Sequence, residues 1–310
     1  MVDAPLLADL GDIPDGGHAI YVTASDGVRV RVAWWGGHKR GTVYLMPGRT
    51  EYIEKYCHVI RRLKERRFNV VCFDWRGQGL SDRPDDRLDI GHVEKFSDYQ
   101  LDVAAALADD DIANLSGPKF LFAHSMGGAI GLRSIAQGLE VKAAVFSSPM
   151  WGLKHADILR PVFGPANLMA RPFNKHKNLF PGTKPTFYVQ VEPFEDNAIT
   201  TDRPHWDMMK NHINQHEALG LGGPTIHWVT LAAKDMAQLR KLTLPNIPML
   251  VLKAENEMVV DPVAIDKRMP TLPDARLETI AGAKHEIWME TPAIQTRVWS
   301  RTDAFLEDVG

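Results

Sequence analysis

The stretch "FLFAHSMGGAIGLR", residues 120–133, places one serine between an apolar run and a run of small residues. The apolar run predicts a buried strand, and the small-residue run predicts a helix. Ser125 would then occupy a strand–turn–helix junction, which is the setting of a nucleophile elbow. Such a turn strains the serine backbone and needs small residues two positions away on each side. Ala123 and Gly127 meet this requirement.

The residue pattern of this motif is weak evidence for a nucleophile by itself. With glycine and serine each at about 7% of residues, a G-x-S-x-G pattern arises by chance in about one chain in ten of this length. A similar pattern, "TASDG" around Ser25, lies on an expected hairpin turn with no helix after it. Ser125 taken alone therefore leaves two roles open, packing or nucleophilic attack, and its partners must decide between them.

The rest of the chain alternates short apolar runs with segments of helical length. Near-continuous apolar strands are typical of a parallel sheet that is buried on both faces. The alternation predicts an α/β fold with a mostly parallel central sheet and helices on both faces. Two further strands are expected at residues 19–24 and 28–35, joined by a Ser-Asp-Gly turn. The apolar runs are residues 42–46, 69–73, 119–123, 142–146, 247–252 and 275–280. The helical segments are residues 51–67, 97–113, 126–138, 261–269 and 292–308.

One interval interrupts this alternation. From Trp151 to Ala237 the chain mixes Pro, Gly and Asn with large apolar residues such as Trp206, Met209 and Trp228. Because long segments without regular structure are uncommon unless they serve a function, we expect an inserted, mainly helical cap over a pocket. A structural excursion with no contact to any site is the alternative. The predicted organisation is an α/β core formed by residues 1–150 and 238–310, with the cap at 151–237.

Composition and charge exclude several classes of partner. The chain has 310 residues, 45% of them hydrophobic and 24% charged, with a net charge of -3 and both signs interspersed. These values suit one large globular domain or a domain with an insertion. Without a basic block no nucleic-acid surface is expected, and without an apolar run of about 18 residues no transmembrane segment is expected. A small molecule is the expected partner, and no prediction follows for the oligomeric state.

The first residues and the cysteines bear on the cellular compartment. The stretch "MVDAPLLADLGDIPDGG" has no basic region followed by a long apolar core, so no signal peptide is expected. Cys57 and Cys72 suggest no disulfide framework, and Cys72 lies within the apolar run "NVVCF". A reducing cytoplasm is the expected location, with a peripheral contact to a membrane left open.

A serine nucleophile needs a base that accepts its proton and an acid that orients the base. In enzymes with a nucleophile elbow, the order along the chain is serine, acid, histidine. His285 follows the last predicted strand on a small-residue loop, where an open α/β sheet builds its site. Glu257 and Asp261 both follow the strand at 247–252. Asp261 precedes Pro262 in the manner of a helix N-cap, so Glu257 is the preferred acid and Asp261 the alternative.

The tetrahedral intermediate of acyl transfer needs hydrogen-bond donors already in place for its oxyanion. One is expected from the backbone N–H of Met126, the residue after the serine. The second is expected after the first buried strand, where Gly48 lets the backbone approach the substrate closely and the Arg49 N–H follows. The Arg49 side chain has two interpretations, a contact with a substrate phosphate or, as the preferred one, an ion pair with Glu51 or Glu54.

These residues together resemble the α/β-hydrolase superfamily, within its serine-hydrolase branch of monoglyceride lipases and bacterial lysophospholipases. The resemblance covers residues 18–305 in the family's order and spacing. Each segment alone is weak, whereas the combination is highly specific. The segments that carry it are "LMPGRTEYIEKY", "VVCFDWRGQGLSDR", "FLFAHSMGGAIGLR", "VFSSPMWGL", "NAITTDRPHW", "LVLKAENEMVVDP" and "GAKHEIWME".

The resemblance implies a role for each candidate residue. Ser125 would be the nucleophile, Glu257 the triad acid and His285 the base. Arg49 and Met126 would form the oxyanion hole, and the insertion would be the family's lid. The implied enzyme is a serine hydrolase that cleaves carboxylic esters of an apolar acyl group through an acyl-enzyme, as a lysophospholipase or monoacylglycerol lipase does. Its substrate would be lipid-like, and neither a metal nor a cofactor is implied.

Two departures from the family pattern point toward the bacterial lysophospholipase branch. Pro47-Gly48 stands where many relatives carry His-Gly, and the acid at Glu257 is more often an aspartate. Both features occur in that branch, so they favour it without deciding the head group of the substrate.

Three other functions stay open at this stage. A general carboxylesterase acting on small or aryl esters would use the same triad. A metal-dependent hydrolase could use His212 and His216, spaced i, i+4, although "HINQHE" lacks the glutamate of the H-E-x-x-H motif. A non-catalytic ligand-binding protein on the same fold would be expected to have lost part of the constellation, whereas every part is present in this sequence.

Overall fold

The fold is a nine-stranded sheet in a computed structural model that describes residues 2–83, 87–154, 164–165, 167–173 and 175–310. Within these residues the strand order is β1-β2-β3-β5-β4-β6-β7-β8-β9. Strands β4 to β9 pair in parallel, while β1, β2 and β3 form antiparallel pairs. The predicted mostly parallel α/β sheet is therefore confirmed. The strands are β1 (Val2–Asp3), β2 (Gly17–Thr23), β3 (Arg29–Trp35), β4 (Gly41–Met46), β5 (Phe68–Phe73), β6 (Lys119–His124), β7 (Ala143–Ser147), β8 (Pro248–Ala254) and β9 (Asp274–Ile280).

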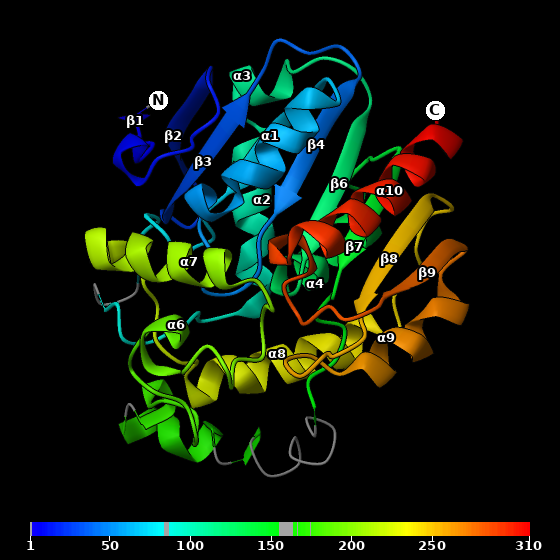
Figure 1. Cartoon of the computed structure of the whole chain (residues 1–310). Coiled ribbons are helices and arrows are strands. Elements are labelled where there is room, and N and C mark those ends of the chain that lie inside the picture. The colour runs from blue at the N-terminus through cyan, green and yellow to red at the C-terminus, as the bar shows by residue number, and fades with distance from the viewer. Residues whose placement is uncertain (1, 84–86, 155–163, 166, 174) are drawn as a thin grey trace.

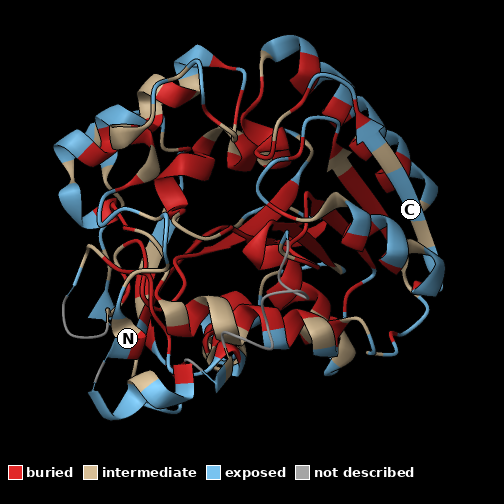
Figure 2. Cartoon of the chain, turned by 90° about the horizontal axis from the view of Figure 1, so that it is seen from below, coloured by how far each residue is buried: buried red, intermediate tan, exposed pale blue. Residues whose placement is uncertain are grey.

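The central strands explain the apolar runs of the sequence. β4, β5 and β7 are buried along their whole length, so both of their faces carry apolar side chains. Figure 2 shows these buried strands in the middle of the molecule and exposed residues on the outer sides of the peripheral helices. The sequence predicts every strand except β1, whose two exposed residues carry no apolar pattern.

Helices cover both faces of the sheet. α1 (Cys57–Glu65) and α10 (Pro292–Asp308) pack on one face, toward which Leu45 of β4 points. The next residue, Met46, joins the core on the opposite face, where α2 (Tyr99–Leu107), α4 (Met126–Ala136) and α8 (Ile226–Leu239) pack. Because side chains alternate across a strand, one strand supplies both cores. The α/β core also contains α3 (Asp110–Ala113) and α9 (Pro262–Arg268).

The segment between β7 and β8 includes the helices labelled α6 (Tyr188–Val191), α7 (Arg203–Gln215) and α8 (Ile226–Leu239). Asp202 caps α7 and Thr225 caps α8, each through a side-chain oxygen that accepts a backbone N–H. Figure 1 shows all three helices below the carboxyl ends of the parallel strands.

The two larger helices of this segment pack differently. Trp206 and Met209 of α7 form a separate apolar cluster with Tyr52, while Trp228 and Met236 of α8 join the main core. The predicted cap boundary at residue 237 falls within α8, and the role of residues 151–237 as a lid stays a prediction. Among the described residues, no helix has both the length and the apolarity needed to cross a membrane.

Candidate active site

Ser125 lies in a tight turn between β6 and α4. β6 ends at His124 and α4 begins at Met126, and Ser125 has a φ of 49° and a ψ of -117°. A positive φ is strained for a residue with a side chain and persists where the surrounding structure enforces it. Here the Ser125 carbonyl accepts hydrogen bonds from the N–H groups of Gly128 and Met150, at 2.9 and 2.8 Å. The turn thereby fixes Ser125 at the carboxyl edge of the sheet.

Gly127 allows this turn to pack against the neighbouring strand. A Cβ built at Gly127 would lie 2.1 Å from the carbonyl oxygen of Met46 and 2.5 Å from that of Pro47. Both are backbone atoms, so they cannot move aside as a flexible side chain could. Ala123, two residues before the serine, is fully buried in the core and accommodates its methyl group there.

Three side chains form a hydrogen-bonded chain at this edge. His285 Nε2 lies 2.9 Å from Ser125 Oγ, and His285 Nδ1 lies 2.8 Å from Glu257 Oε2 and 3.0 Å from Glu257 Oε1. The residues follow β6, β9 and β8, so all three lie beyond the carboxyl ends of parallel strands, where open α/β sheets build their sites. All three are buried. The structure thus brings together the serine, histidine and glutamate that the sequence analysis selects.

Glu257 is held as a carboxylate. Burial disfavours its charge, but hydrogen bonds from His285 and from the N–H groups of Val259 and Val260 lower its pKa to about 2. The two backbone bonds to Oε1 are 2.8 and 3.1 Å long. An ionised acceptor at Nδ1 can fix the imidazole tautomer that leaves Nε2 free to accept a proton.

Asp261, the alternative acid, lies elsewhere. It is the N-cap of α9, and its Oδ1 accepts the Val263 N–H at 3.0 Å. This is the role that the Asp-Pro pair indicates in the sequence. The structure therefore places Glu257, and not Asp261, beside the histidine.

The low pKa of Glu257 gives stability a defined dependence on pH. The pKa falls from 4.5 to about 2, so the stabilisation is fully present above pH 4.5 and is lost as the pH falls toward 2. As the pH falls from about 5 to about 3, protonation of Glu257 should lower the free energy of unfolding of the wild type by about 2 kcal/mol. Glu257→Gln has no carboxylate at this position and should not show this additional loss. Urea denaturation at each pH measures this difference. Asp266→Asn, at an exposed carboxylate, is the control, and an unchanged pH slope in Glu257→Gln would contradict the role of its charge.

His124, which precedes Ser125, packs its ring against the ring of His285 but has its hydrogen-bond partner elsewhere. Its ring centroid lies 4.8 Å from that of His285, and its Nδ1 lies 3.0 Å from the Ser147 carbonyl oxygen. Burial lowers the pKa of His124 to about 4, so the ring is neutral at neutral pH. A neutral ring adds no repulsion to a positive charge that forms on His285.

The loop after β4 lies against the serine. A Cβ on Gly48 would come 3.1 Å from the Cβ of Ser125, so the missing side chain permits this approach. Gln78 Nε2 donates to the Gly48 carbonyl at 2.8 Å, and the Glu51 carboxylate accepts the Gly48 N–H. The backbone of the loop is thereby fixed on both sides of Gly48.

Two backbone N–H groups near this loop are available as donors. Across the described ranges, neither the Arg49 N–H nor the Met126 N–H makes a hydrogen bond. Met126 also begins α4, where unpaired N–H groups and the helix dipole favour negative charge. Donors that are fixed before the reaction can stabilise the oxyanion of acyl transfer.

A buried charge network behind the loop is absent from the sequence predictions. Lys55 Nζ lies 2.8 Å from Glu51 Oε1 and 2.7 Å from Glu286 Oε1, and all three side chains are buried. Because Glu51 holds Gly48 and Glu286 adjoins His285, this Glu51–Lys55–Glu286 network connects the loop after β4 to the histidine loop. The i, i+4 spacing of Glu51 and Lys55 is a signal for the pair, whereas the sequence holds no signal for Glu286.

The prediction of an ion pair between Arg49 and Glu51 or Glu54 is wrong. Both carboxylates bind other cations. Glu51 Oε1 lies 2.8 Å from Lys55 Nζ, and Glu54 Oε2 lies 2.7 Å from Arg31 Nη2. The Arg49 side chain extends toward the segment between β7 and β8, where its Nη2 donates to the Gly222 carbonyl at 2.7 Å.

The Arg49 guanidinium is left without a counter-ion. Its Cζ lies 5.2 Å from the centre of the Trp228 ring, and its Nε is buried with no hydrogen-bond partner. Burial lowers the pKa of Arg49 to about 10, so the group stays a cation at neutral pH. In the part of the chain that the structure describes, no carboxylate lies within ion-pair distance of it.

A cavity of about 300 Å³ opens over the serine. Its polar end is formed by Ser125, His285, Arg49 and Glu286. The rest is largely apolar and comes mainly from the segment between β7 and β8, which is the usual character of a small-molecule site. The apolar lining includes Met150, Leu153, Phe187, Val189, Met209 and Trp228.

The histidine pair of the metal-hydrolase alternative is not assembled. His212 Nδ1 lies 3.2 Å from the Tyr52 hydroxyl in the interior, whereas His216 contacts Asp9 nearer the surface. α7 ends at Gln215, and His216 is its C-cap. The two imidazoles therefore have separate partners.

Comparison with known proteins assigns the family. Residues 37–292 match the family model Hydrolase_4, described as serine aminopeptidase, S33. The match covers most of the chain, including Ser125, Glu257 and His285. The chain belongs to this family. The Hydrolase_4 assignment confirms the predicted resemblance to the α/β-hydrolases, and the chain is a serine ester hydrolase.

Individual relatives of this Hydrolase_4 chain agree with that assignment. Probable lysophospholipase L2 of Haemophilus influenzae is 30% identical over 276 residues, 86% of this chain and 84% of the relative. Lysophospholipase L2 of Escherichia coli K12 is 30% identical over 291 residues, 88% of this chain and 83% of the relative. The crystal structure of a soluble variant of monoglyceride lipase from Saccharomyces cerevisiae, with a substrate analog, has a TM-score of 0.71 at 19% identity. The alignment covers 99% of this chain and 100% of the yeast chain. This likeness shows the shared fold.

Proposed function

We propose that this serine hydrolase is a lysophospholipase that releases a fatty acid through an acyl-enzyme on Ser125. The observation that carries the proposal is the hydrogen-bonded chain Ser125–His285–Glu257 at the polar end of an apolar cavity. The two relatives at 30% identity are named as lysophospholipases, which supports the same class of substrate.

The first half-reaction acylates the serine. His285 Nε2 takes the proton of Ser125 Oγ while Oγ attacks the ester carbonyl carbon. The carbonyl oxygen becomes an oxyanion, and the N–H groups of Arg49 and Met126 donate to it. Glu257 stabilises the imidazolium. The ester C–O bond then breaks, the leaving alcohol oxygen takes the proton from His285, and the acyl group stays on Oγ.

The second half-reaction restores the enzyme. His285 takes a proton from a water molecule as that water attacks the acyl carbonyl. The same donors hold the second oxyanion. When the intermediate collapses, the fatty acid leaves and Ser125 Oγ regains its proton from His285.

The cavity lining suits an acyl chain. Its apolar residues lie next to the serine, so a chain bound among them places its carbonyl carbon near Oγ. Each methylene that leaves water contributes about 0.8 kcal/mol to binding.

Arg49 favours a phospholipid over a neutral glyceride. Arg49 lines the same cavity as Ser125. Its guanidinium has no carboxylate partner among the residues that the structure describes, and its buried Nε is unpaired. A phosphodiester would supply the missing acceptor, because guanidinium groups form charge-assisted hydrogen bonds with phosphate oxygens. A monoacylglycerol offers only hydroxyl groups at this position.

A paired assay tests the head group. Fatty-acid release is measured from a lysophosphatidylcholine and a monoacylglycerol that carry the same acyl chain. We expect a higher kcat/KM for the phospholipid, and we expect Arg49→Met to lower that value by about 10- to 100-fold through the lost charge-assisted bond. The value for the glyceride should stay nearly constant.

Arg83→Met is the matched control for this assay. Arg83 also donates to a carbonyl of the segment between β7 and β8, that of Ala218 at 2.7 Å, and also has an unpaired buried nitrogen. It does not line the cavity over Ser125. Equal losses on both substrates in Arg49→Met, or a preference of the wild type for the glyceride, would contradict the phosphate role. Cleavage of short aryl esters alone would leave a general carboxylesterase.

A further inference from the structure

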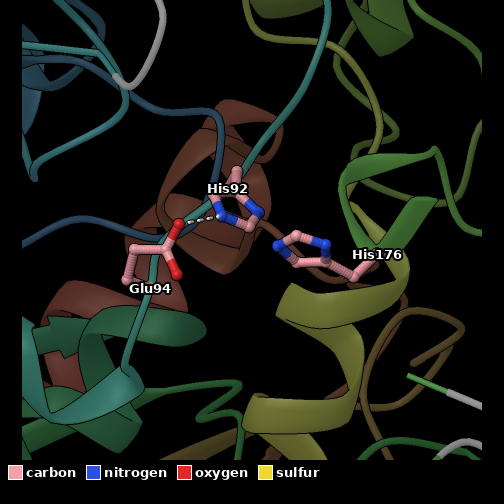
Figure 3. A group of neighbouring side chains, drawn as sticks. All are labelled: His92, Glu94 and His176. Carbon is pink, nitrogen blue, oxygen red and sulfur yellow. Dashed lines mark hydrogen bonds and ion pairs between the residues drawn. The ribbon is translucent and has the colours of Figure 1, made fainter. Parts of the chain in front are cut away.

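Two segments far apart in the sequence bring imidazole and carboxylate groups together away from the serine. His92 and Glu94 lie between β5 and α2, and His176 lies in the turn Lys175–Lys177 of the segment between β7 and β8. One nitrogen or oxygen from each side chain lies within 4.8 Å of those of the other two. Figure 3 shows the three side chains facing one another. None of them lines the cavity over Ser125.

His176 has no hydrogen-bond partner that would explain its burial. The residue is 8% exposed, and its Nδ1 is buried without a partner. Among the described residues, neither of its ring nitrogens makes a hydrogen bond. A buried polar group without a partner costs about 1–3 kcal/mol, and native proteins satisfy most such groups. The ring lies against His92 and His227 through edge contacts only, with centroids 6.0 and 5.4 Å away.

His92 is already oriented in the way that a metal ligand requires. Its Nδ1 lies 3.0 Å from Thr225 Oγ1, and its Nε2 lies 3.2 Å from Glu94 Oε1. A threonine hydroxyl can either donate or accept. Thr225 can therefore hold the ring in the tautomer that carries its proton on Nδ1 and leaves the Nε2 lone pair free. An oriented second nitrogen of this kind is typical of metal-bound histidines.

Glu94 is free to adjust its position as a ligand, whereas both ring nitrogens of His227 already have partners. Glu94 is exposed, and its ion pair with Arg171 is weak, because the two groups are 3.9 Å apart and both are about half exposed. His227 has both nitrogens engaged, Nδ1 with Asn167 and Nε2 with the Glu94 carbonyl.

We propose that His92, Glu94 and His176 bind a Zn²⁺ ion that ties the Lys175–Lys177 turn to the loop between β5 and α2. Two imidazole nitrogens and one carboxylate are a common ligand set for this ion, with water in the fourth position. Bond lengths of about 2.0–2.2 Å place tetrahedral ligand atoms about 3.3–3.6 Å apart. His92 Nε2 and Glu94 Oε1 already lie 3.2 Å apart, so a bound ion requires a small shift of His176 or of the exposed Glu94 side chain from the present spacing of up to 4.8 Å. The ion has no part in ester hydrolysis, and it stabilises the segment over the cavity.

Calorimetric titration of the full chain with Zn²⁺ alone, after removal of metals by a chelator, tests this site. We expect one ion per chain, and an affinity at least about tenfold lower in His176→Ala and in Glu94→Gln. Glu94→Gln changes an exposed side chain, so it keeps the test valid if His176→Ala folds poorly. His216→Ala is the matched control, because His216 also contacts a carboxylate, that of Asp9, in a separate place.

Thermal unfolding gives a second readout that does not depend on activity. Zn²⁺ should raise the Tm of the wild type and of His216→Ala, because an ion that binds only the folded state stabilises it. At the same Zn²⁺ concentration it should raise the Tm of His176→Ala and Glu94→Gln by clearly less. Absence of saturable binding by the wild type, or equal affinity in the wild type and both site variants, would overturn the proposal.

Discussion

Replacing Ser125 with alanine is expected to lower kcat for ester hydrolysis by about 10⁵-fold or more, because the acyl-enzyme can no longer form. The oxyanion donors and the cavity remain in the variant, so a small residual rate above that of water is expected. Because only Oγ is removed, the loss should appear in kcat with little change in KM. Steady-state kinetics on the lysophospholipid and on a chromogenic aryl ester measure both parameters.

Ser25→Ala is the control for this prediction. Ser25 carries a similar sequence pattern but lies in the turn between β2 and β3, outside the cavity. Its variant should hydrolyse both esters at the wild-type rate. Turnover by Ser125→Ala at a substantial fraction of the wild-type rate would exclude Ser125 as the nucleophile.

Replacing Lys55 with methionine is expected to lower the free energy of unfolding by about 3–5 kcal/mol, because it leaves two buried carboxylates without their cation. Burial raises the pKa of Glu286, and Lys55 is the cation that opposes this shift. For Glu51, burial opposes the charge, but Lys55, together with His124 and the Tyr56 hydroxyl, lowers the pKa to about 2. Without the ammonium, at least one carboxyl group must take up a proton when the chain folds. Denaturation by urea measures the loss.

Lys253→Met is the matched control for Lys55→Met. Lys253 pairs with Asp266, whose side chain is 48% exposed, and such pairs contribute about 0–1 kcal/mol. A destabilisation of Lys55→Met no larger than that of Lys253→Met would mean that the Glu51–Lys55–Glu286 network contributes little. Lys55→Met should also lower kcat, because Glu51 then holds the Gly48 N–H less firmly.

The sheet and the hydrogen-bonded chain of three residues could be predicted from the sequence, because each rests on a local pattern. The buried strands appear as apolar runs, and a parallel sheet gathers its strand ends at one edge. Ser125, Glu257 and His285 each follow such a run. The Asp-Pro pair predicts a helix N-cap at Asp261 and so favours Glu257 as the acid, and the structure confirms that Asp261 caps α9.

Features that depend on contacts distant in sequence could not be predicted. Glu286 is 231 positions from Lys55, and His176 lies in a different segment from His92. The error on Arg49 has the same origin. Glu51 and Glu54 are near it in the sequence, but tertiary contacts pair both acids with other cations. Burial of charged groups therefore has to be read from the folded chain.

The most direct test of the account is the mass of the intact protein after reaction with a fluorophosphonate that carries a long alkyl chain. If Ser125 is the nucleophile, the wild type gains one adduct per chain on the peptide that contains Ser125, loses ester hydrolysis in proportion to labelling, and Ser125→Ala gains no adduct. A fully active protein without an adduct, or an adduct on another residue that accounts for the inactivation, would contradict this role of Ser125.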